Sequence, residues 1–289
     1  MDRQPMSLTF DIEDWTHPEL VREHVAPNEL RTVVREVTEA ILEVLERHNA
    51  RGTFFVLGEV ARRFPDLVRR IARAGHEIGS HGYSHTPLRQ LDPESFRAEV
   101  RNARAAIKEA LDEDPVRGFR APSFSLDRST AWALEVLAEE GFDYDSSIFP
   151  MKVKMYGVSG VPLGIYRPAV DDLRRHDANG RVIEFPVAIY QAGSFRLPVS
   201  GGFYLRVLPF GLIEASLDAI LKRRPANMFL HPWECVPDLP RVSLGAVARF
   251  ITYINLRGVL DKLERLAARY SVRPMIEILG DGGHLRRAA

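Results

Sequence analysis

The sequence predicts an α/β protein that folds as an open or distorted (β/α) barrel, and three observations favour this fold class. Short apolar segments of strand character alternate with segments whose apolar residues recur at helical spacing. The chain of 289 residues is long enough to bury a large core. Residues with catalytic potential follow several strand-like segments, and in (β/α) barrels the chemistry lies at the carboxyl ends of the strands.

The expected elements alternate along the first half of the chain and again near residue 230. Strand composition is found at residues 7–12, 52–57, 77–80, 118–120, 142–145 and 227–230. Helical spacing is found at residues 28–49, 65–74, 93–111, 129–140 and 210–222. Pro27 and Asn28 supply a cap for the first of these helices. Alternation of this kind indicates a mainly parallel sheet.

Residues 149–209 interrupt the alternation. They are rich in Pro and Gly and contain β-like pieces at 182–189 and 202–207, so we interpret them as a β-rich insertion packed on the barrel. A long helix over 244–270 and a closing strand over 274–279 complete the pattern, and the tail after Gly280 is expected to fray. We expect a single domain over residues 1–289, with a C-terminal helical extension from about residue 232 to 289.

The composition excludes several classes of partner and location. The 39 basic and 39 acidic side chains cancel, which argues against nucleic acid or an anionic membrane as the main partner. Cys235 is the only cysteine, so an intrachain disulfide is impossible. The first ten residues lack the pattern of a signal peptide, and no apolar run approaches the ~20 residues of a membrane span. We expect a cytoplasmic protein without a transmembrane segment; the sequence indicates no oligomeric state.

An acidic cluster follows the first strand-like segment. In the run TFDIEDW, the carboxylates of Asp11, Glu13 and Asp14 lie within four positions. Like charges this close repel each other unless a cation or a shared proton compensates them. The cluster therefore indicates either a cation site or an acidic turn without function.

A histidine pair follows the third strand-like segment, in the run GHEIGSHGYSH. His81 and His85 are four residues apart, so one helical turn would place both imidazoles on the same face. Two histidines and one carboxylate suit Zn²⁺ or another divalent ion of the first transition row and leave positions open for water and substrate. His76 precedes the strand and is interpreted as structural.

Three further motifs carry single residues of interest. Arg120 in GFRAPS could hold a carboxylate in bidentate fashion, although a surface position is the more common fate of an arginine. Asp145 in DYDSS follows a short strand and means little alone. His231 in MFLHPWE leaves a buried strand for a Pro-Trp turn, which is typical of a general acid or of a histidine satisfied inside a core.

Taken in order, the runs TFDIED, HGYSH, RAPS, YDSS and FLH resemble the motifs of the polysaccharide deacetylase family, also called NodB-like or carbohydrate esterase family 4. The runs SGGFYLRVLP, HPWE and PRVSLGAVARFITYINL resemble the exopolysaccharide-associated deacetylases that carry a C-terminal extension. The resemblance covers nearly the whole chain. It implies a distorted (β/α) barrel of the NodB-like type.

The resemblance also implies a role for each matching residue. These roles are catalytic base for Asp11, metal ligands for His81 and His85, partner of the base for Arg120, orientation of the acid for Asp145, and general acid for His231. The family's second aspartate is replaced by Ile12, so the third metal ligand is either Glu13 or Asp14. Strand alternation places Glu13 on the side of Asp11, while Asp14 begins the turn and could swing in. A second departure is Gly82, where the family more often has Ser or Thr.

The function implied is that of a metal-dependent polysaccharide N-deacetylase, a hydrolase of linear amide bonds that takes a divalent metal, with zinc as the first choice. Its substrate would be the N-acetylated amino sugars of a bacterial polysaccharide, such as an exopolysaccharide, or of its lipid-linked precursor. One alternative is an amidohydrolase or deformylase acting on a small or lipid-linked amide. Another is a non-catalytic carbohydrate-binding protein, against which the presence of Asp11, His81 and His231 argues.

Overall fold

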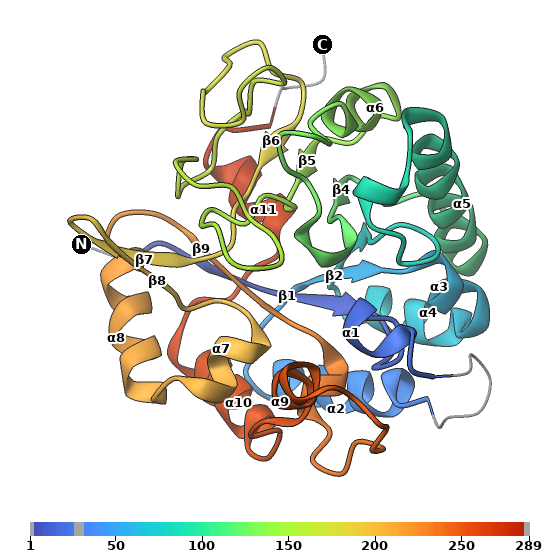
Figure 1. Cartoon of the computed structure of the whole chain (residues 1–289), viewed down its shortest axis with the longest axis vertical. Helices are drawn as coiled ribbons and strands as arrows, with labels where there is room; N and C mark the ends of the chain where they lie inside the picture. Colours follow the sequence, from blue (N-terminus) through green and yellow to red (C-terminus); the bar gives the residue numbers. More distant parts are fainter. Residues whose placement is uncertain (1–2, 26–31, 286–289) are drawn as a thin grey trace.

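The computed structural model describes residues 3–25 and 32–285 of the chain. Within these residues a seven-stranded sheet has the order β6-β5-β4-β3-β2-β1-β9, and its neighbouring strands are parallel. The strands are β1 (Met6–Ile12), β2 (Thr53–Val56), β3 (Glu77–Ser80), β4 (Gly118–Phe119), β5 (Tyr144–Asp145), β6 (Ile183–Glu184) and β9 (Ala226–Leu230). Helices surround the curved sheet (Figure 1), which is the predicted open, distorted (β/α) barrel.

Strand β1 is the central element of the site because it pairs with β2 on one side and with β9 on the other. All seven of its residues are buried. Asp11 lies opposite Phe55, and Thr9 lies between Thr53 and Phe229. Parallel pairing in this register brings the carboxyl ends of β1, β2 and β9 to the same edge of the sheet.

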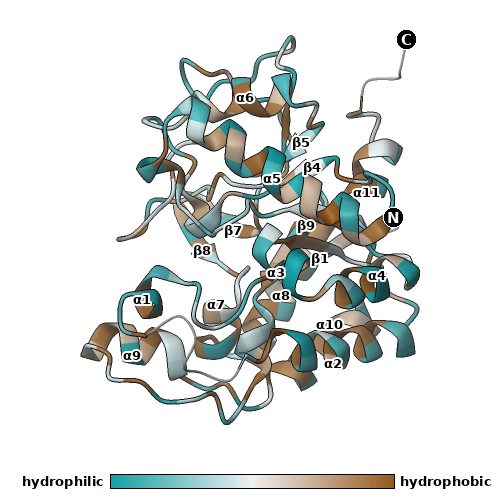
Figure 2. Ribbon diagram, turned by 90° about the vertical axis from the view of Figure 1, so that its right-hand side faces the viewer, coloured by the Kyte–Doolittle hydropathy of each residue, from teal (hydrophilic) through white to brown (hydrophobic). Residues whose placement is uncertain are grey.

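The predicted outer helices form close to their expected positions. They are α2 (Val34–Arg47), α4 (Pro65–Arg73), α5 (Pro93–Leu111), α6 (Ala133–Glu139) and α8 (Phe210–Leu221), with α3 (Gly58–Arg63) as an addition. Helix α5 begins as its sequence indicates, because Asp92 accepts a hydrogen bond from the Ser95 N–H and Pro93 occupies the first turn. The Pro27–Asn28 cap expected for the first helix lies outside the described residues. Figure 2 shows that these helices mix hydrophilic and hydrophobic residues, as helices with one face on a sheet do.

The long helix expected over 244–270 is two helices, α9 (Ala246–Tyr253) and α10 (Val259–Arg269). Between them, Asn255 and Gly258 have φ angles of 45° and 77°. A left-handed conformation ends a helix, and asparagine and glycine adopt it at low cost. The apolar spacing continues across this break, which is why periodicity alone suggested one helix.

The strand expected over 274–279 is wrong: this segment is the helix α11 (Met275–Asp281). Its first two N–H groups donate to the side chains of Thr53 and Glu77, which satisfies donors that a helix start leaves free. Its apolar residues pack against Phe55 and Tyr144 of the sheet. The β-like composition of a short segment was overridden by these tertiary contacts.

Residues 149–209 contribute β6 to the main sheet and form a separate antiparallel hairpin, β7 (Ile189–Ala192) with β8 (Phe195–Pro198). The β-like piece expected at 202–207 is instead the helix α7 (Gly202–Val207). The buried side chain of Arg206 donates to the carbonyl of Gly202, and this hydrogen bond stabilises the helical turn. The remaining short elements are α1 (Glu19–Arg22), η1 (Leu88–Gln90), η2 (Pro122–Phe124) and η3 (Pro232–Cys235). Among the described helices, none has both the length and the apolar character that crossing a membrane demands.

Candidate active site

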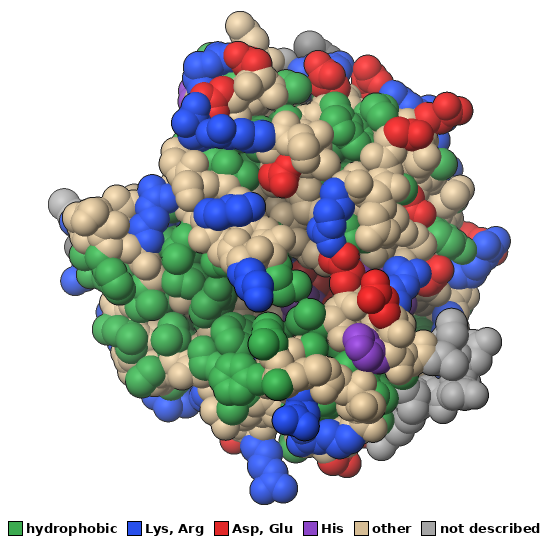
Figure 3. Space-filling model, in the orientation of Figure 1, with side chains coloured by type: hydrophobic (Ala, Val, Ile, Leu, Met, Phe, Trp, Pro, Cys, Tyr) green, Lys and Arg blue, Asp and Glu red, His purple; other side chains and the backbone are tan. Residues whose placement is uncertain are grey.

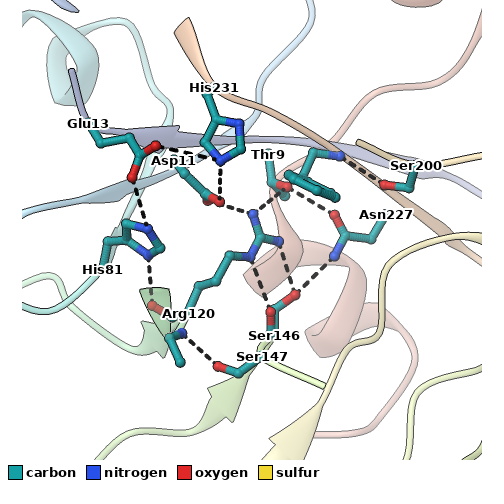
Figure 4. Close-up of polar contacts among 12 residues, drawn as sticks. Thr9, Asp11, Glu13, His81, Arg120, Ser146, Ser147, Ser200, Asn227 and His231 are labelled. Carbon is teal, nitrogen blue, oxygen red and sulfur yellow. Dashed lines mark hydrogen bonds and ion pairs between the residues drawn. The ribbon is translucent and has the colours of Figure 1, made fainter. Parts of the chain in front are cut away.

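Four strands of the sheet deliver the predicted site residues to one edge. Asp11 lies in β1 and Glu13 follows it, while His81, Arg120 and His231 come directly after β3, β4 and β9. Figure 4 shows these side chains converging on one another from opposite sides. All of them except His231 are buried. The strand-end positions predicted from the sequence are therefore brought together.

Glu13, His81 and His85 form a compact cluster of metal-ligand atoms, which all lie within 4.8 Å of one another. Glu13 Oε2 lies 2.5 Å from His85 Nε2 and 3.7 Å from His81 Nε2. The other oxygen of Glu13 accepts a hydrogen bond from Trp233 Nε1 at 3.3 Å. One carboxylate and two imidazoles fit a divalent transition metal and leave coordination positions open.

The neighbours of the cluster favour the tautomer and the protonation states that can bind a cation. His81 Nδ1 lies 2.8 Å from the carbonyl oxygen of Arg120, and a carbonyl only accepts, so Nδ1 carries the proton and Nε2 offers its lone pair. Burial alone would raise the pKa of Glu13, but His85, His231 and His81 hold it well below its ordinary value. Burial lowers the pKa of His85, and Glu13 opposes this only in part. An ionised carboxylate and neutral imidazoles are the forms that bind a metal.

Of the two acids between which the sequence left the third ligand open, Glu13 lies with the two histidines and Asp14 lies apart from them. The carboxylate of Asp14 accepts hydrogen bonds from the backbone N–H groups of Trp15 and Val33. It therefore ties the turn after β1 to the start of α2 and is not part of the histidine cluster. The ligand role of Glu13 itself is a proposal.

The two histidines are presented by an irregular turn, not by the helical turn that their spacing suggested. Residues 81–85 contain no helix, and Gly82 and His85 have φ angles of 79° and 58°. Gly82 replaces the Ser or Thr common in the family, and its left-handed conformation suits glycine. The spacing was informative although the predicted local structure was wrong.

Asp11 is held by Arg120, which is completely buried. Arg120 Nη1 donates to Asp11 Oδ1 at 2.7 Å and to Thr9 Oγ1 at 3.0 Å, while Nε and Nη2 donate to the carbonyl and hydroxyl of Ser146. Its guanidinium also lies 4.3 Å from the ring centre of Phe55. A side chain fixed in this way can orient a carboxylate without moving.

Thr9, Ser146 and Asn227 support this arginine, and sequence reasoning missed all three. Asn227 accepts from Thr9 Oγ1 and donates to Ser146 Oγ, both at 3.0 Å, which closes a network across β1, β9 and the end of β5 (Figure 4). The available signal was a polar residue inside an apolar strand, at Thr9 in SLTFDI and at Asn227 in ANMFL. Such a residue needs a buried hydrogen-bond partner.

His231 approaches Asp11 and Glu13 from the opposite side. Its Nε2 lies 3.8 Å from Asp11 Oδ2 and 3.7 Å from Glu13 Oε1, and its ring stacks on Trp233. Burial lowers the pKa of His231, but Glu13, Glu234 and Asp11 together raise it to about 9. An imidazolium at neutral pH is suited to donate a proton.

The expectation that Asp145 orients His231 is corrected by the structure. The carboxylate at His231 Nδ1 is that of Glu234, at 3.1 Å. Asp145 instead accepts from the backbone and hydroxyl of Ser147 and faces Glu184, its register partner in β6. Burial raises the pKa of Asp145 to about 6 and that of Glu184 well above its ordinary value, so the two carboxyl groups share a proton near neutral pH. Asp145 is a structural residue of the β5–β6 pair.

The cluster opens into a cavity of about 340 Å³, the size of a small-ligand site. Aromatic side chains line it, namely Phe124, Tyr156, Phe203, Tyr204, Phe229 and Trp233. Trp15 and Tyr83, which lie close to the site motifs in the sequence, do not line it; Trp15 is fully buried in a core cluster. Figure 3 shows hydrophobic side chains gathered over the α7–α8 region beside the hollow.

This fold and site define a class: (β/α) barrels with a buried carboxylate–histidine–histidine cluster at the carboxyl edge of the sheet and an arginine-held aspartate beside it. Residues 1–144 match the family model described as polysaccharide deacetylase, so this part of the chain belongs to that family. Residues 146–280 match a second model, described as a domain of unknown function (DUF3473). Strands β1–β4 come from the first segment and β6 and β9 from the second, so both contribute to one sheet.

Several known proteins are similar to parts of this chain. A peptidoglycan-N-acetylglucosamine deacetylase of Bacillus cereus is 36% identical over 102 residues, which are 35% of this chain and 36% of that protein. A chitooligosaccharide deacetylase of Rhizobium leguminosarum bv. trifolii is 37% identical over 101 residues, 35% of this chain and 44% of that protein. The chain thus spans less than half the length of these relatives.

A solved structure extends the similarity to the whole fold. A Mycobacterium smegmatis protein assigned to the polysaccharide deacetylases superposes with a TM-score of 0.63 and 22% identity, over 100% of this chain and 94% of that one. This likeness confirms the NodB-like type of the distorted (β/α) barrel.

Proposed function

We propose that this protein is a metal-dependent hydrolase that removes N-acetyl groups from amino sugars of a bacterial polysaccharide or of its lipid-linked precursor. The observation that carries the proposal is that Asp11 and His231 line the same cavity as the Glu13–His81–His85 cluster, with His231 Nε2 facing both Asp11 and Glu13. The family membership and the relatives named as deacetylases support the same reaction.

Glu13, His81 and His85 would hold a divalent cation. The donor set of one carboxylate and two imidazoles favours Zn²⁺. When bound, such a cation supplies Lewis-acid polarisation of the acetyl carbonyl and activation of the attacking water. The hydrogen bond from His81 Nδ1 to the Arg120 carbonyl fixes the ring and its tautomer, so the lone pair of Nε2 would be available to the cation.

Asp11 acts as the general base in this proposal. Arg120 occupies its Oδ1, so Oδ2 is the oxygen that accepts the proton of the attacking water as the new C–O bond forms. Because the arginine is locked by Ser146 and Thr9, the carboxylate keeps its orientation through the reaction. Pre-organisation of this kind lowers the reorganisation that the transition state requires.

His231 acts as the general acid. Its Nε2 lies on the side of Asp11 and Glu13, and the neighbouring carboxylates raise its pKa, which favours the protonated ring that an acid requires. As the C–N bond breaks, Nε2 gives its proton to the departing sugar amine, and acetate remains. An amine is a poor leaving group unless it is protonated, so this step is required.

The developing oxyanion is best placed near the backbone of Ser123 and Phe124, where the N–H of Ser123 is the candidate donor because that of Phe124 donates to the Ala121 carbonyl at 3.3 Å. Both residues line the cavity and have positive φ angles of 56° and 47°, a strained conformation that functional sites often contain. The polar groups of Tyr144 are engaged elsewhere, because its N–H donates to the carbonyl of Arg117 and its hydroxyl donates to Glu77. The aromatic lining offers flat surfaces on which sugar rings can stack.

The test is a metal analysis of the purified protein combined with acetate release from a panel of N-acetylated glycans. The panel contains chitin oligomers, peptidoglycan fragments and a lipid-linked N-acetylamino sugar, with a formylated sugar-lipid and a small cyclic amide as rival substrates. We expect about one zinc per chain, acetate from at least one glycan, and loss of turnover after chelation that zinc restores. Full turnover by exhaustively chelated protein would remove the cation from the mechanism.

A further inference from the structure

The carboxylate of Glu234 contacts His231 in two places. Its Oε2 lies 3.1 Å from His231 Nδ1 and also accepts the backbone N–H of His231 at 3.1 Å. Both residues belong to the η3 turn, in which His231 is the cap, Pro232 follows it and Glu234 reaches back. This is the geometry of a capping box, so the local fold of the run HPWE is enough to place the Glu234 carboxylate beside His231.

Arg206 fixes the other oxygen of this carboxylate. Its Nη2 donates to Glu234 Oε1 at 2.9 Å, and both side chains are buried. The remaining bonds of the guanidinium go to backbone carbonyls of Gly202, Ile251, Thr252 and Ile254. The five N–H donors of an arginine are thus matched by five acceptors, which leaves the guanidinium one position.

Gly202 makes room for the carboxylate. A Cβ atom added at this position would lie 1.7 Å from Glu234 Oε2, far inside van der Waals contact. The segments around Gly202, Glu234 and residues 251–254 are remote in sequence and come together around this ion pair. Burying the Arg206–Glu234 ion pair has a desolvation cost, so its position next to His231 suggests that it serves the function of this histidine.

We propose that Glu234 and Arg206 are positioning residues for His231. Glu234 accepts the Nδ1–H of His231, so that Nε2 is the nitrogen that carries and delivers the proton, and Arg206 holds Glu234 in the position that this requires. This inference rests on the proposed function, in which His231 is the acid. On this inference, residues 146–280, whose family model is described as a domain of unknown function, supply the general acid and the residues that position it. Residues 1–144 supply the base and the metal ligands.

The proton path is simple. During C–N cleavage Nε2–H passes to the amine nitrogen, and the imidazole left behind keeps Nδ1–H on Glu234. Without Glu234 a neutral imidazole can hold its proton on either nitrogen and can rotate. Glu234→Gln cannot serve as well, because its amide has one oxygen for two donors, Arg206 on one side and His231 on the other.

The experiment compares an amide with an ester in the zinc-loaded protein. For a chitin oligomer we expect Glu234→Gln and Glu234→Ala to lower kcat by about 10²-fold, with KM changed less than about threefold and zinc content unchanged. For 4-nitrophenyl acetate, whose phenolate leaves without a proton, the loss is much smaller. The ester-to-amide ratio of kcat therefore rises by at least about tenfold. A merely structural role would lower both rates together and leave the ratio unchanged.

One further variant, with its control, keeps the inference testable if Glu234 variants fold poorly. Gly202→Ala displaces the carboxylate without changing it and should raise the same ratio. Gly211→Ala is its matched control, since Gly211 also lies in the first turn of a helix and a Cβ there meets nothing within 4 Å. Glu234→Asp, which keeps the charge, should recover part of the amide kcat.

His231→Ala separates failure of this inference from failure of the proposed function. We expect His231→Ala to raise the ratio at least as much as Glu234→Gln, and the double variant to be no slower than His231→Ala alone. If His231→Ala lowers amide kcat and Glu234→Gln does not, the positioning role is wrong and the acid remains. If His231→Ala keeps full amide turnover, the acid assignment falls and the positioning role falls with it.

Discussion

Arg120 Nη1 and Asp11 Oδ1 are 2.7 Å apart, and both side chains are buried. The pair joins the end of β4 to the end of β1, and Ser146 extends it to β5. Burying two charges is expensive unless each remains fully paired. This contact therefore serves both the stability of the barrel edge and the orientation of the proposed base.

Replacing this arginine tests both consequences. We expect Arg120→Met to lower the free energy of unfolding by about 3–5 kcal/mol, because the buried carboxylate of Asp11 loses its hydrogen-bonded ion-pair partner, and to abolish acetate release. Urea denaturation of the chelated protein measures the first effect without any contribution from metal. Arg101→Met is the control: Arg101 pairs with Glu140 at the surface, with 63% of its side chain exposed, and should change stability by less than about 1 kcal/mol. Equal losses for both variants would contradict the argument.

The metal cluster is tested by a pair of neighbouring acids. Glu13→Gln should lose most of the bound zinc, because an amide oxygen is a weaker ligand than a carboxylate and Glu13 is the acid beside both histidines. Asp14→Asn should keep its zinc, because Asp14 hydrogen-bonds the turn instead. Zinc per chain, measured after dialysis, checks the prediction. Retention in the first variant and loss in the second would exchange the roles of the two acids.

The catalytic roles are tested by two substitutions that leave the cluster intact. Asp11→Asn removes the proton acceptor and should lower acetate release from a chitin oligomer by about 10³-fold or more, with zinc binding only partly impaired. His231→Ala should lower it by about 10²–10⁴-fold through loss of the acid. Undiminished turnover in both variants would refute the assignment of base and acid.

The strand-end residues of the site were predictable from the sequence, and the reason is local. Where an apolar strand-like segment ends at a polar residue, that residue is expected at the carboxyl edge of the sheet. This rule predicts the positions of Asp11, His81, Arg120 and His231 from the sequence alone. Short segments with mixed signals were predicted less well. Residues 202–207 and 274–279 have strand-like composition, yet tertiary contacts make them helices α7 and α11.

Contacts between residues that only the packing of the chain brings together could not be predicted from the sequence. Glu234 was visible in HPWE, where Pro and Glu after a cap could have indicated the capping box, but its contact with Arg206 joins positions 28 residues apart. Asp145 shows the opposite error, since a family position was occupied by the expected residue type while its side chain faces Glu184. Motif identity predicted the chemistry of the site better than it predicted which carboxylate touches which histidine.

The pair of Asp145 and Glu184 predicts how stability depends on pH. Burial raises the pKa of both carboxyl groups in the folded state, that of Asp145 from 3.8 to about 6 and that of Glu184 well above its usual value. The native state then binds more protons than the unfolded state, so this pair makes stability fall as pH rises from about 4 through 6 and beyond. Glu184→Gln removes the repulsion, keeps a hydrogen-bonding group beside Asp145, and should flatten that fall. Melting temperatures of the chelated wild type and variant, measured from pH 4.5 to 8, check this. If the two curves stay parallel over this range, the buried pair does not share a proton.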